Sequence, residues 1–176
     1  MKSKAFLIGI VALVFGLAAY VSHIEKAEVI RFNDQVVERV IQSDGRFPAV
    51  LDAFELYFNE EGASTLVSLT KRVEVLRTEV EGDIDEYKAM QLKGGPRGEA
   101  FHEAGSAYLS VSKAYVSGFE QFLNYAAGNP ERIEGQRVFW GQLMGVLEQR
   151  SDEAMKTYLD RQKAFADLHG FTIHKD

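Results

Sequence analysis

The chain opens with an uncharged, mostly apolar run from Ala5 to Ser22, and Lys2 and Lys4 are the charged residues before it. At a rise of about 1.5 Å per residue, a helix over this run reaches about 27 Å, against roughly 30 Å for the hydrocarbon core of a bilayer. We therefore predict that residues 1–23 are a transmembrane anchor that contacts the membrane through residues 5–22.

A cleaved signal peptide is the alternative interpretation of this run. Such a signal has a basic start, an apolar core of about 7–15 residues and small residues before the cut, and Gly16 and Ala18 would serve there. A retained signal-anchor is favoured, because the run is longer than such a core and continues into an amphipathic helix. The basic N-terminus predicts a single pass through the inner (cytoplasmic) membrane, with that end cytoplasmic and the rest extracytoplasmic or periplasmic. Cleavage would release an exported soluble protein.

Beyond residue 23, apolar and small residues recur every three or four positions, which is the period of a helix with one buried face. Four such segments follow one another, at about 24–60, 64–92, 99–127 and 131–168. The second is the clearest, because a heptad seam with one polar exception runs through it. The members of this seam are Leu66, Leu69, Val73, Leu76, Val80, Asp83, Tyr87 and Met90.

Three interruptions separate or bend these segments. Pro48 has no backbone N–H to donate to the preceding turn, but the apolar stripe keeps its phase on both sides, which predicts one long helix kinked near Pro48. Lys93–Gly98 and Gly128–Pro130 break the helical pattern completely. Short connections place neighbouring helices antiparallel. We therefore predict an all-α fold, with an up-down-up-down four-helix bundle at residues 24–170 and a C-terminal tail at 171–176.

This layout, an N-terminal anchor followed by an exported helical bundle, is similar to that of the LemA family and of the sensor domains of bacterial chemoreceptors. The chain lacks the early signature with arginine and tryptophan that a LemA protein carries. It also lacks the second membrane span of a chemoreceptor. The resemblance therefore implies the architecture and no particular activity.

Charge and cysteine content limit the partners. Two of the 20 basic residues lie in the leader, which leaves 18 against 26 acidic residues and a formal charge of −8 for the remainder. Nucleic acid is not an expected partner, because its phosphates need a basic face. With no cysteine, the chain has neither disulfides nor a lipidation site.

The strongest metal-ligand pattern is Glu99 with His102, because Glu-x-x-His places both side chains on one helical face, as in di-iron bundles. Such a site needs a second copy of the motif and two further glutamates, and the chain has one copy. Covalent haem attachment requires cysteine, and no phosphate-binding glycine loop or Ser-His-Asp pattern is present. We predict no cofactor, no metal, no catalytic residue and no enzymatic activity.

The third segment interleaves small residues with Tyr108 and Tyr115. Small residues allow helices to pack closely, or they leave room for a ligand lined by tyrosine rings and hydroxyls. Close packing is the simpler interpretation. Tyr108 and Tyr115 are therefore the candidate ligand-binding residues of the alternative.

Residue counts along antiparallel helices place Asp83 opposite Tyr108, and Tyr108 opposite Arg150. Both charged residues interrupt apolar seams. We predict a buried polar layer of Asp83, Tyr108 and Arg150, in which the guanidinium and the hydroxyl satisfy the carboxylate.

Three functions of different kinds fit these patterns. The favoured one is a membrane-anchored extracytoplasmic bundle that acts without catalysis through contacts with another membrane or extracytoplasmic protein, as a scaffold, adaptor or assembly factor. The second is a small-molecule sensor or binding bundle that uses the tyrosines of the third segment. The third is a metal- or haem-binding bundle.

Overall fold

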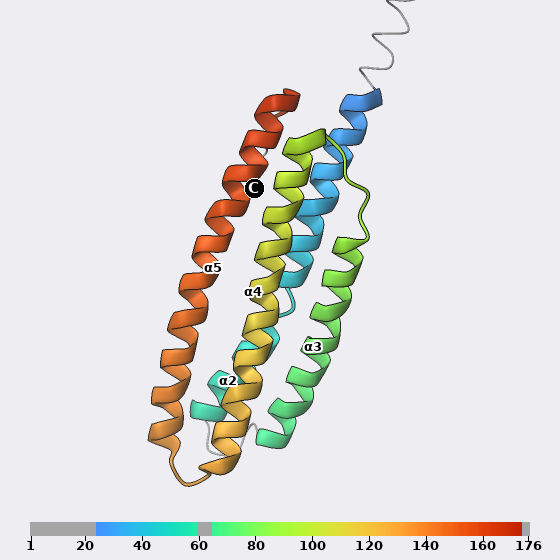
Figure 1. Ribbon diagram of the computed structural model, residues 1–176. Helices are drawn as coiled ribbons and strands as arrows, with labels where there is room; N and C mark the ends of the chain where they lie inside the picture. Colours follow the sequence, from blue (N-terminus) through green and yellow to red (C-terminus); the bar gives the residue numbers. More distant parts are fainter. Residues whose placement is uncertain (1–23, 60–64, 174–176) are drawn as a thin grey trace, which may run out of the picture.

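The computed structural model describes residues 24–59 and 65–173, and this part of the chain is all-α (Figure 1). The predicted anchor at residues 1–23 lies outside the described residues, and so do residues 174–176 of the predicted tail. Within the described residues, none of the helices has an apolar stretch long enough to cross a membrane.

Four helices pack side by side as a bundle, as predicted, and the first of them is bent. The first column consists of the N-terminal helix, described over residues 24–44, and α2 (Pro48–Asn59). The others are α3 (Leu66–Lys88), α4 (Gly95–Gly128) and α5 (Ile133–His169). Residue 24, the α3–α4 connection and the end of α5 lie at one end of the bundle (Figure 1). The α4–α5 turn lies at the other end, so successive columns are antiparallel.

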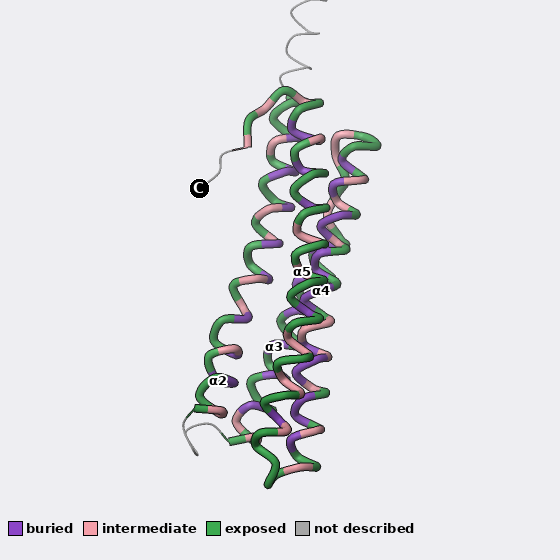
Figure 2. The backbone as a smooth tube through the Cα atoms, turned by 90° about the vertical axis from the view of Figure 1, so that its left-hand side faces the viewer, coloured by how far each residue is buried: buried purple, intermediate pink, exposed green. Residues whose placement is uncertain are grey.

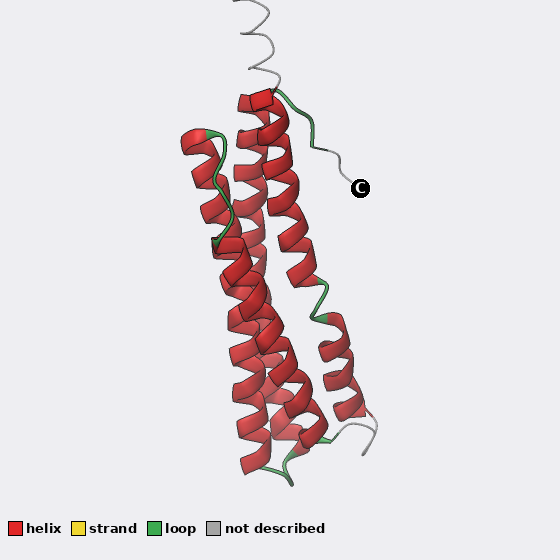
Figure 3. Ribbon diagram, turned by 90° about the vertical axis from the view of Figure 1, so that its right-hand side faces the viewer, coloured by secondary structure: helices red, strands yellow, loops and turns green. Residues whose placement is uncertain are grey.

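The bend in the first column lies at residues 45–47, next to the predicted kink at Pro48 (Figure 3). The N–H of Phe47 donates to the carbonyl of Asp44 at 3.2 Å, which closes the last turn of the N-terminal helix. Pro48 then occupies the first position of α2, where its missing N–H has no partner to lose. Helical structure therefore stops and restarts here, instead of continuing through a kink.

The α3–α4 connection differs from the predicted break. Helix α3 ends at Lys88, two residues before the last member of the predicted seam, and residues 89–94 run as a loop along the bundle. Gly94 adopts a left-handed conformation with φ of 80°, and Pro96 follows in the first turn of α4. The predicted break at Lys93–Gly98 therefore lies partly inside the helix, because Pro is well tolerated at a helix start.

Buried and exposed residues alternate along every helix, and the buried ones form two aromatic clusters (Figure 2). One cluster surrounds Phe54, whose ring stacks on Trp140 with centroids 4.3 Å apart. The other surrounds Phe101 and Phe165, whose rings stack at 5.4 Å. Along the first column, the residues of one cluster end at Val40 and those of the other begin at Phe47. The bend therefore lies where the two clusters meet, and Ser43 and Ser112 are buried beside it. This position brings polar groups into the middle of the bundle.

Candidate functional site

The bend holds a basic residue against α3. Arg46 Nε lies 2.5 Å from Asp83 Oδ2, and Arg46 Nη2 lies 2.9 Å from Asp83 Oδ1. A third guanidinium nitrogen lies 3.3 Å from Glu79. Asp83 is only 3% exposed, and such a two-pronged pair is the geometry in which an arginine satisfies a buried carboxylate best. Arg46 thereby ties the bend to the seam of α3.

The same bend directs an acidic residue toward α4. The hydroxyl of Tyr108 lies 2.9 Å from each carboxylate oxygen of Asp44 and donates its proton to them. Burial raises the pKa of Asp44, and the hydrogen bond from Tyr108 opposes that rise. Burial and the nearby Asp44 charge raise the pKa of the Tyr108 hydroxyl. At neutral pH Tyr108 is therefore a proton donor to a carboxylate.

The predicted polar layer of Asp83, Tyr108 and Arg150 is therefore wrong in its pairing, because these three residues do not contact one another as predicted. Asp83 is buried, as its place in the seam indicates, but it pairs with Arg46. Arg150 is exposed, whereas its neighbour Ser151 is partly buried and lines a groove. The inward stripe of α5 passes through Ser151, which turns Arg150 toward water. Tyr108 lies beside the bend with a different carboxylate.

A groove of about 280 Å³ opens beside the bend, between the first column, α4 and α5. Both candidate ligand-binding residues, Tyr108 and Tyr115, line it. We call it the bend groove. Its other walls are formed mainly by Asp44, Phe47, Leu51, Met144, Glu148 and Ser151.

The bend groove is acidic. Asp44 and Glu148 line it, and none of the described Lys, Arg or His residues does. Burial raises the pKa of Tyr115, and the negative charges of Glu148, Asp152 and Asp44 add to that rise. The hydroxyl of Tyr115 therefore keeps its proton at neutral pH beside these carboxylates.

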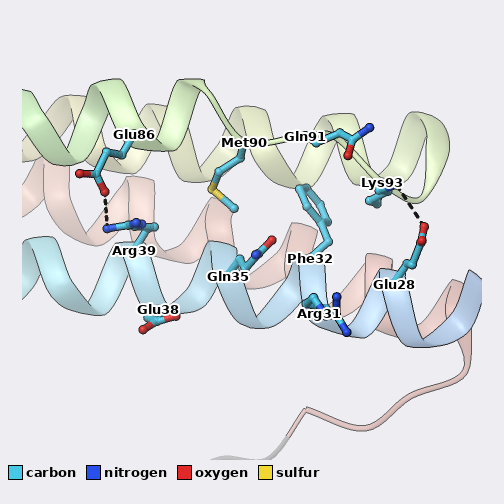
Figure 4. A pocket seen from close by; sticks show the side chains of 10 residues that line it. All are labelled: Glu28, Arg31, Phe32, Gln35, Glu38, Arg39, Glu86, Met90, Gln91 and Lys93. Atoms are coloured by element: carbon cyan, nitrogen blue, oxygen red, sulfur yellow. Dashed lines mark hydrogen bonds and ion pairs between the residues drawn. The ribbon is translucent and has the colours of Figure 1, made fainter.

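A second groove, of about 450 Å³, separates the N-terminal helix from the end of α3 and the following loop (Figure 4). Two ion pairs cross it. Arg39 lies 2.6 Å from Glu86, and Lys93 lies 3.0 Å from Glu28. Within each pair the basic and the acidic side chain neutralise each other, so the groove has no strong preference for a charged ligand.

A third groove, of about 1040 Å³, lies between the N-terminal helix, α5 and the C-terminal residues 171–173. We call it the terminal groove, because the Lys26 ammonium donates to the carbonyl of Gly170 at the same end of the bundle. The apolar side chains that line it are Ile30, Val37, Ile41, Phe171 and Ile173. Within residues 24–59 and 65–173, the charged residues that line it are Asp34 and Glu38, and both are acidic.

The metal-ligand candidates do not form a site together. His102 stacks on Tyr87 with ring centroids 4.5 Å apart, and its Nε2 lies 3.1 Å from the Tyr87 carbonyl oxygen. Glu99 is exposed. Over residues 24–59 and 65–173, no group of three or more His, Cys, Asp or Glu side chains is arranged to hold a metal ion.

The polar residues of the bend were not candidates in the sequence. The pattern marks the segment around Pro48 only as an interruption. A usable signal was nevertheless present, because Asp44 and Arg46 carry opposite charges on either side of a glycine, between two apolar stripes. Such charges at an interruption in a bundle need partners on the facing helices.

No protein-family model matches the chain, and no curated protein and no solved structure shows a significant match to it.

Proposed function

We propose that the protein is a membrane-anchored, extracytoplasmic bundle that acts without catalysis through contacts with another protein. The observation that carries this proposal is the terminal groove. Ile41, which lines it, is 64% exposed, and large apolar side chains gathered in an open groove favour contact with a partner. The groove runs along the N-terminal helix from Ile30 toward the bend, and this helix directly follows the predicted anchor, so that a membrane protein is within reach.

The partner that fits the terminal groove is a helix with an apolar face and basic residues beside it. An amphipathic helix places apolar side chains into such grooves. Asp34 and Glu38 at the groove favour Lys or Arg on the partner, since complementary charges speed association and select the orientation.

Site-specific photo-crosslinking in native membranes tests this proposal. A benzophenone amino acid at Ile41 should capture a partner, whereas one at Val75 should not. Val75 is a matched control, because it is apolar and 58% exposed on α3. The double reversal of Asp34→Lys and Glu38→Lys should abolish capture. Equal capture at both positions, or capture that survives the reversal, contradicts the proposal.

The proposed location has its own test. The chain contains no cysteine, so Gly128→Cys introduces a unique thiol on the exposed end of α4. A membrane-impermeant maleimide should label this thiol in intact spheroplasts. Labelling that requires permeabilised cells would place the bundle in the cytoplasm.

A small-molecule binding bundle is the second candidate function. One observation favours it: Tyr108 and Tyr115, the two candidate ligand-binding residues, line the same bend groove. Tyrosine rings and hydroxyls beside apolar side chains are typical of ligand pockets. Nothing in the described residues favours the metal- or haem-binding alternative.

A further inference from the structure

Asp44 is a half-buried carboxylate to which no residue in the described part of the chain supplies a cation. Among the described residues, the ion pairs of the bundle do not include Asp44. The nearest basic residue along the chain, Arg46, is committed to Asp83 and Glu79 on α3. The two charges of the bend therefore have unequal environments, and only the basic one is neutralised.

The carboxylate of Asp44 also keeps hydrogen-bonding capacity. Its two oxygens offer about four acceptor positions, and the single hydroxyl proton of Tyr108 is shared between them. Removing a charge from water is unfavourable unless a counter-charge replaces the lost hydration. A positively charged group that enters the bend groove would supply this counter-charge and use the free acceptor positions.

The walls of the bend groove suit the remainder of an organic cation. The rings of Phe47 and Tyr115 meet edge to face with centroids 5.6 Å apart. Aromatic faces attract ammonium groups as well as apolar groups. Leu51 and Met144 add an apolar surface, and Glu148 adds a second carboxylate.

We propose that the bend groove is a binding site for a small organic cation, an ammonium that carries an aromatic or short alkyl group. The ammonium lies against Asp44 and the tyrosine rings, and the apolar group lies against Leu51 and Met144. The volume of about 280 Å³ lies near the lower end of the roughly 300–1,000 Å³ of ligand pockets. The groove therefore fits a small molecule better than a peptide.

This inference rests on the second candidate function and names its class of ligand. Its failure leaves the terminal groove untouched, because that surface is tested by crosslinking at Ile41, which does not line the bend groove. Conversely, a failed crosslink at Ile41 says nothing about cation binding beside Asp44.

Calorimetric titration of the full chain in a nonionic detergent tests the inference with two probes of equal size. The cation is 2-phenylethylammonium, and its neutral match is 2-phenylethanol. We expect the ammonium to bind about tenfold more tightly than the alcohol, which corresponds to one charge-assisted hydrogen bond. Absence of saturable ammonium binding, or equal binding of the two probes, overturns the proposal.

Three variants locate the site. Asp44→Asn should weaken ammonium binding about tenfold and leave alcohol binding unchanged, because it removes only the charge. Glu148→Gln changes an exposed side chain and should weaken ammonium binding about threefold, as expected for a solvated charge pair. Asp52→Asn, on the exposed face of α2, is the control and should have no effect.

Circular dichroism shows whether each variant is folded. If Asp44→Asn does not fold, Glu148→Gln decides, because an exposed position does not affect the core. Ammonium binding that is unchanged in Glu148→Gln and in a folded Asp44→Asn contradicts the assignment, and so does binding that Asp52→Asn weakens equally.

Discussion

At the scale of single residues, the bend directs the side chains of Asp44 and Arg46, which lie two positions apart, to different helices. Arg46 reaches α3 and satisfies the almost fully buried Asp83, while Asp44 reaches the hydroxyl of Tyr108 on α4. Ser43 adds a hydrogen bond of 3.3 Å to Ser112 inside the bundle. One short turn thus contacts two neighbouring helices through polar groups, which fixes their register relative to the first column.

A double-mutant cycle with Arg46→Met and Asp83→Asn measures the strength of the first contact. We expect a coupling energy of about 1–3 kcal/mol, the range for charged residues in direct contact, from urea denaturation of the four proteins. The side chain of Arg46 is 23% exposed, so solvent screening keeps the coupling below that of a fully buried pair. The matched cycle with Arg150→Met in place of Arg46→Met should give less than about 0.5 kcal/mol. A larger coupling to Arg150 than to Arg46 would contradict the pairing.

Asp44 should make stability depend on pH in the opposite sense to a salt-bridged carboxylate. Burial raises its folded pKa above the ordinary aspartate value of 3.8, so the folded state holds the proton more tightly than the unfolded state. The stability contribution is therefore complete below pH 3.8 and is lost as the pH rises through the folded pKa. Asp44→Asn should gain stability relative to the natural protein across this window, and the gain should be constant at higher pH.

Denaturation series at several pH values check this expectation. Asp52→Asn serves as the control, because Asp52 is an exposed aspartate in the same column. A stability difference between Asp44→Asn and the natural protein that does not change from acid to neutral pH would show that the Asp44 carboxyl titrates alike in both states.

The site could be predicted from the sequence only in part. Asp83 was identifiable, because it is the polar member of an otherwise apolar seam, and Tyr108 was identifiable among small residues. Their partners were not, because a shift of one position around α5 exchanges Ser151 for Arg150 on the inner face. Partner choice in a bundle depends on helix rotation and side-chain reach, and residue counts do not determine either.

At the scale of the elements, α3 and α4 approach closely at a glycine. A Cβ at Gly105 would lie 2.0 Å from the Tyr87 hydroxyl and 2.8 Å from its ring carbon Cζ. That hydroxyl donates to the carbonyl of His102 at 3.0 Å, and Tyr87 is fully buried. The tyrosine therefore has no room to withdraw, and the glycine is required by packing.

Gly105→Ala should accordingly destabilise the bundle by about 1–3 kcal/mol, the usual cost of overpacking a core. Gly145→Ala is the matched control, because nothing lies within 4 Å of a Cβ there. It should stabilise α5 by about 0.5–1 kcal/mol through helix propensity. Thermal unfolding of both variants distinguishes the two effects, and similar changes in both would exclude the close approach of Tyr87.

The existence and order of the helices were predictable, because long apolar stripes at helical spacing run along all four columns. The residues at which the helices begin and end were less predictable. Pro48 and Pro96 are both compatible with either a break or a helix start, and the choice depends on the neighbouring backbone. At Pro96 the left-handed Gly94 and a loop along the bundle allow α4 to begin at Gly95.

At the scale of the whole molecule, acidic residues outnumber basic ones. Two of the grooves are acidic as well. Among the residues that the structure describes, the bend groove and the terminal groove are each lined by two carboxylates and by no basic side chain. The groove in Figure 4 instead contains both signs, joined in pairs. Partners of the first two grooves are therefore expected to be cationic, and their binding should weaken as salt concentration rises.

The arrangement of the ends gives the last prediction. Residue 24 and the start of α4 lie at one end of the bundle, and Gly128 lies at the other (Figure 1). If residues 5–22 span the membrane, a spin label at the start of α4 must be nearer the lipid than one at Gly128. Arg97 is the suitable labelling position there, because Gly95 has a φ of 59° that a side chain would strain.

Arg97→Cys and Gly128→Cys, each labelled with a nitroxide in the full chain, should therefore differ after reconstitution into liposomes. Lipid-bound relaxation agents should broaden the signal at position 97 more than at position 128, because about 34 helical residues, or roughly 50 Å, separate the two ends of α4. Removal of residues 1–23 should abolish this difference, since the bundle then has no fixed orientation at the membrane. Stronger broadening at position 128 would mean that the bundle contacts the membrane by its α4–α5 turn, which is incompatible with an anchor at the N-terminus.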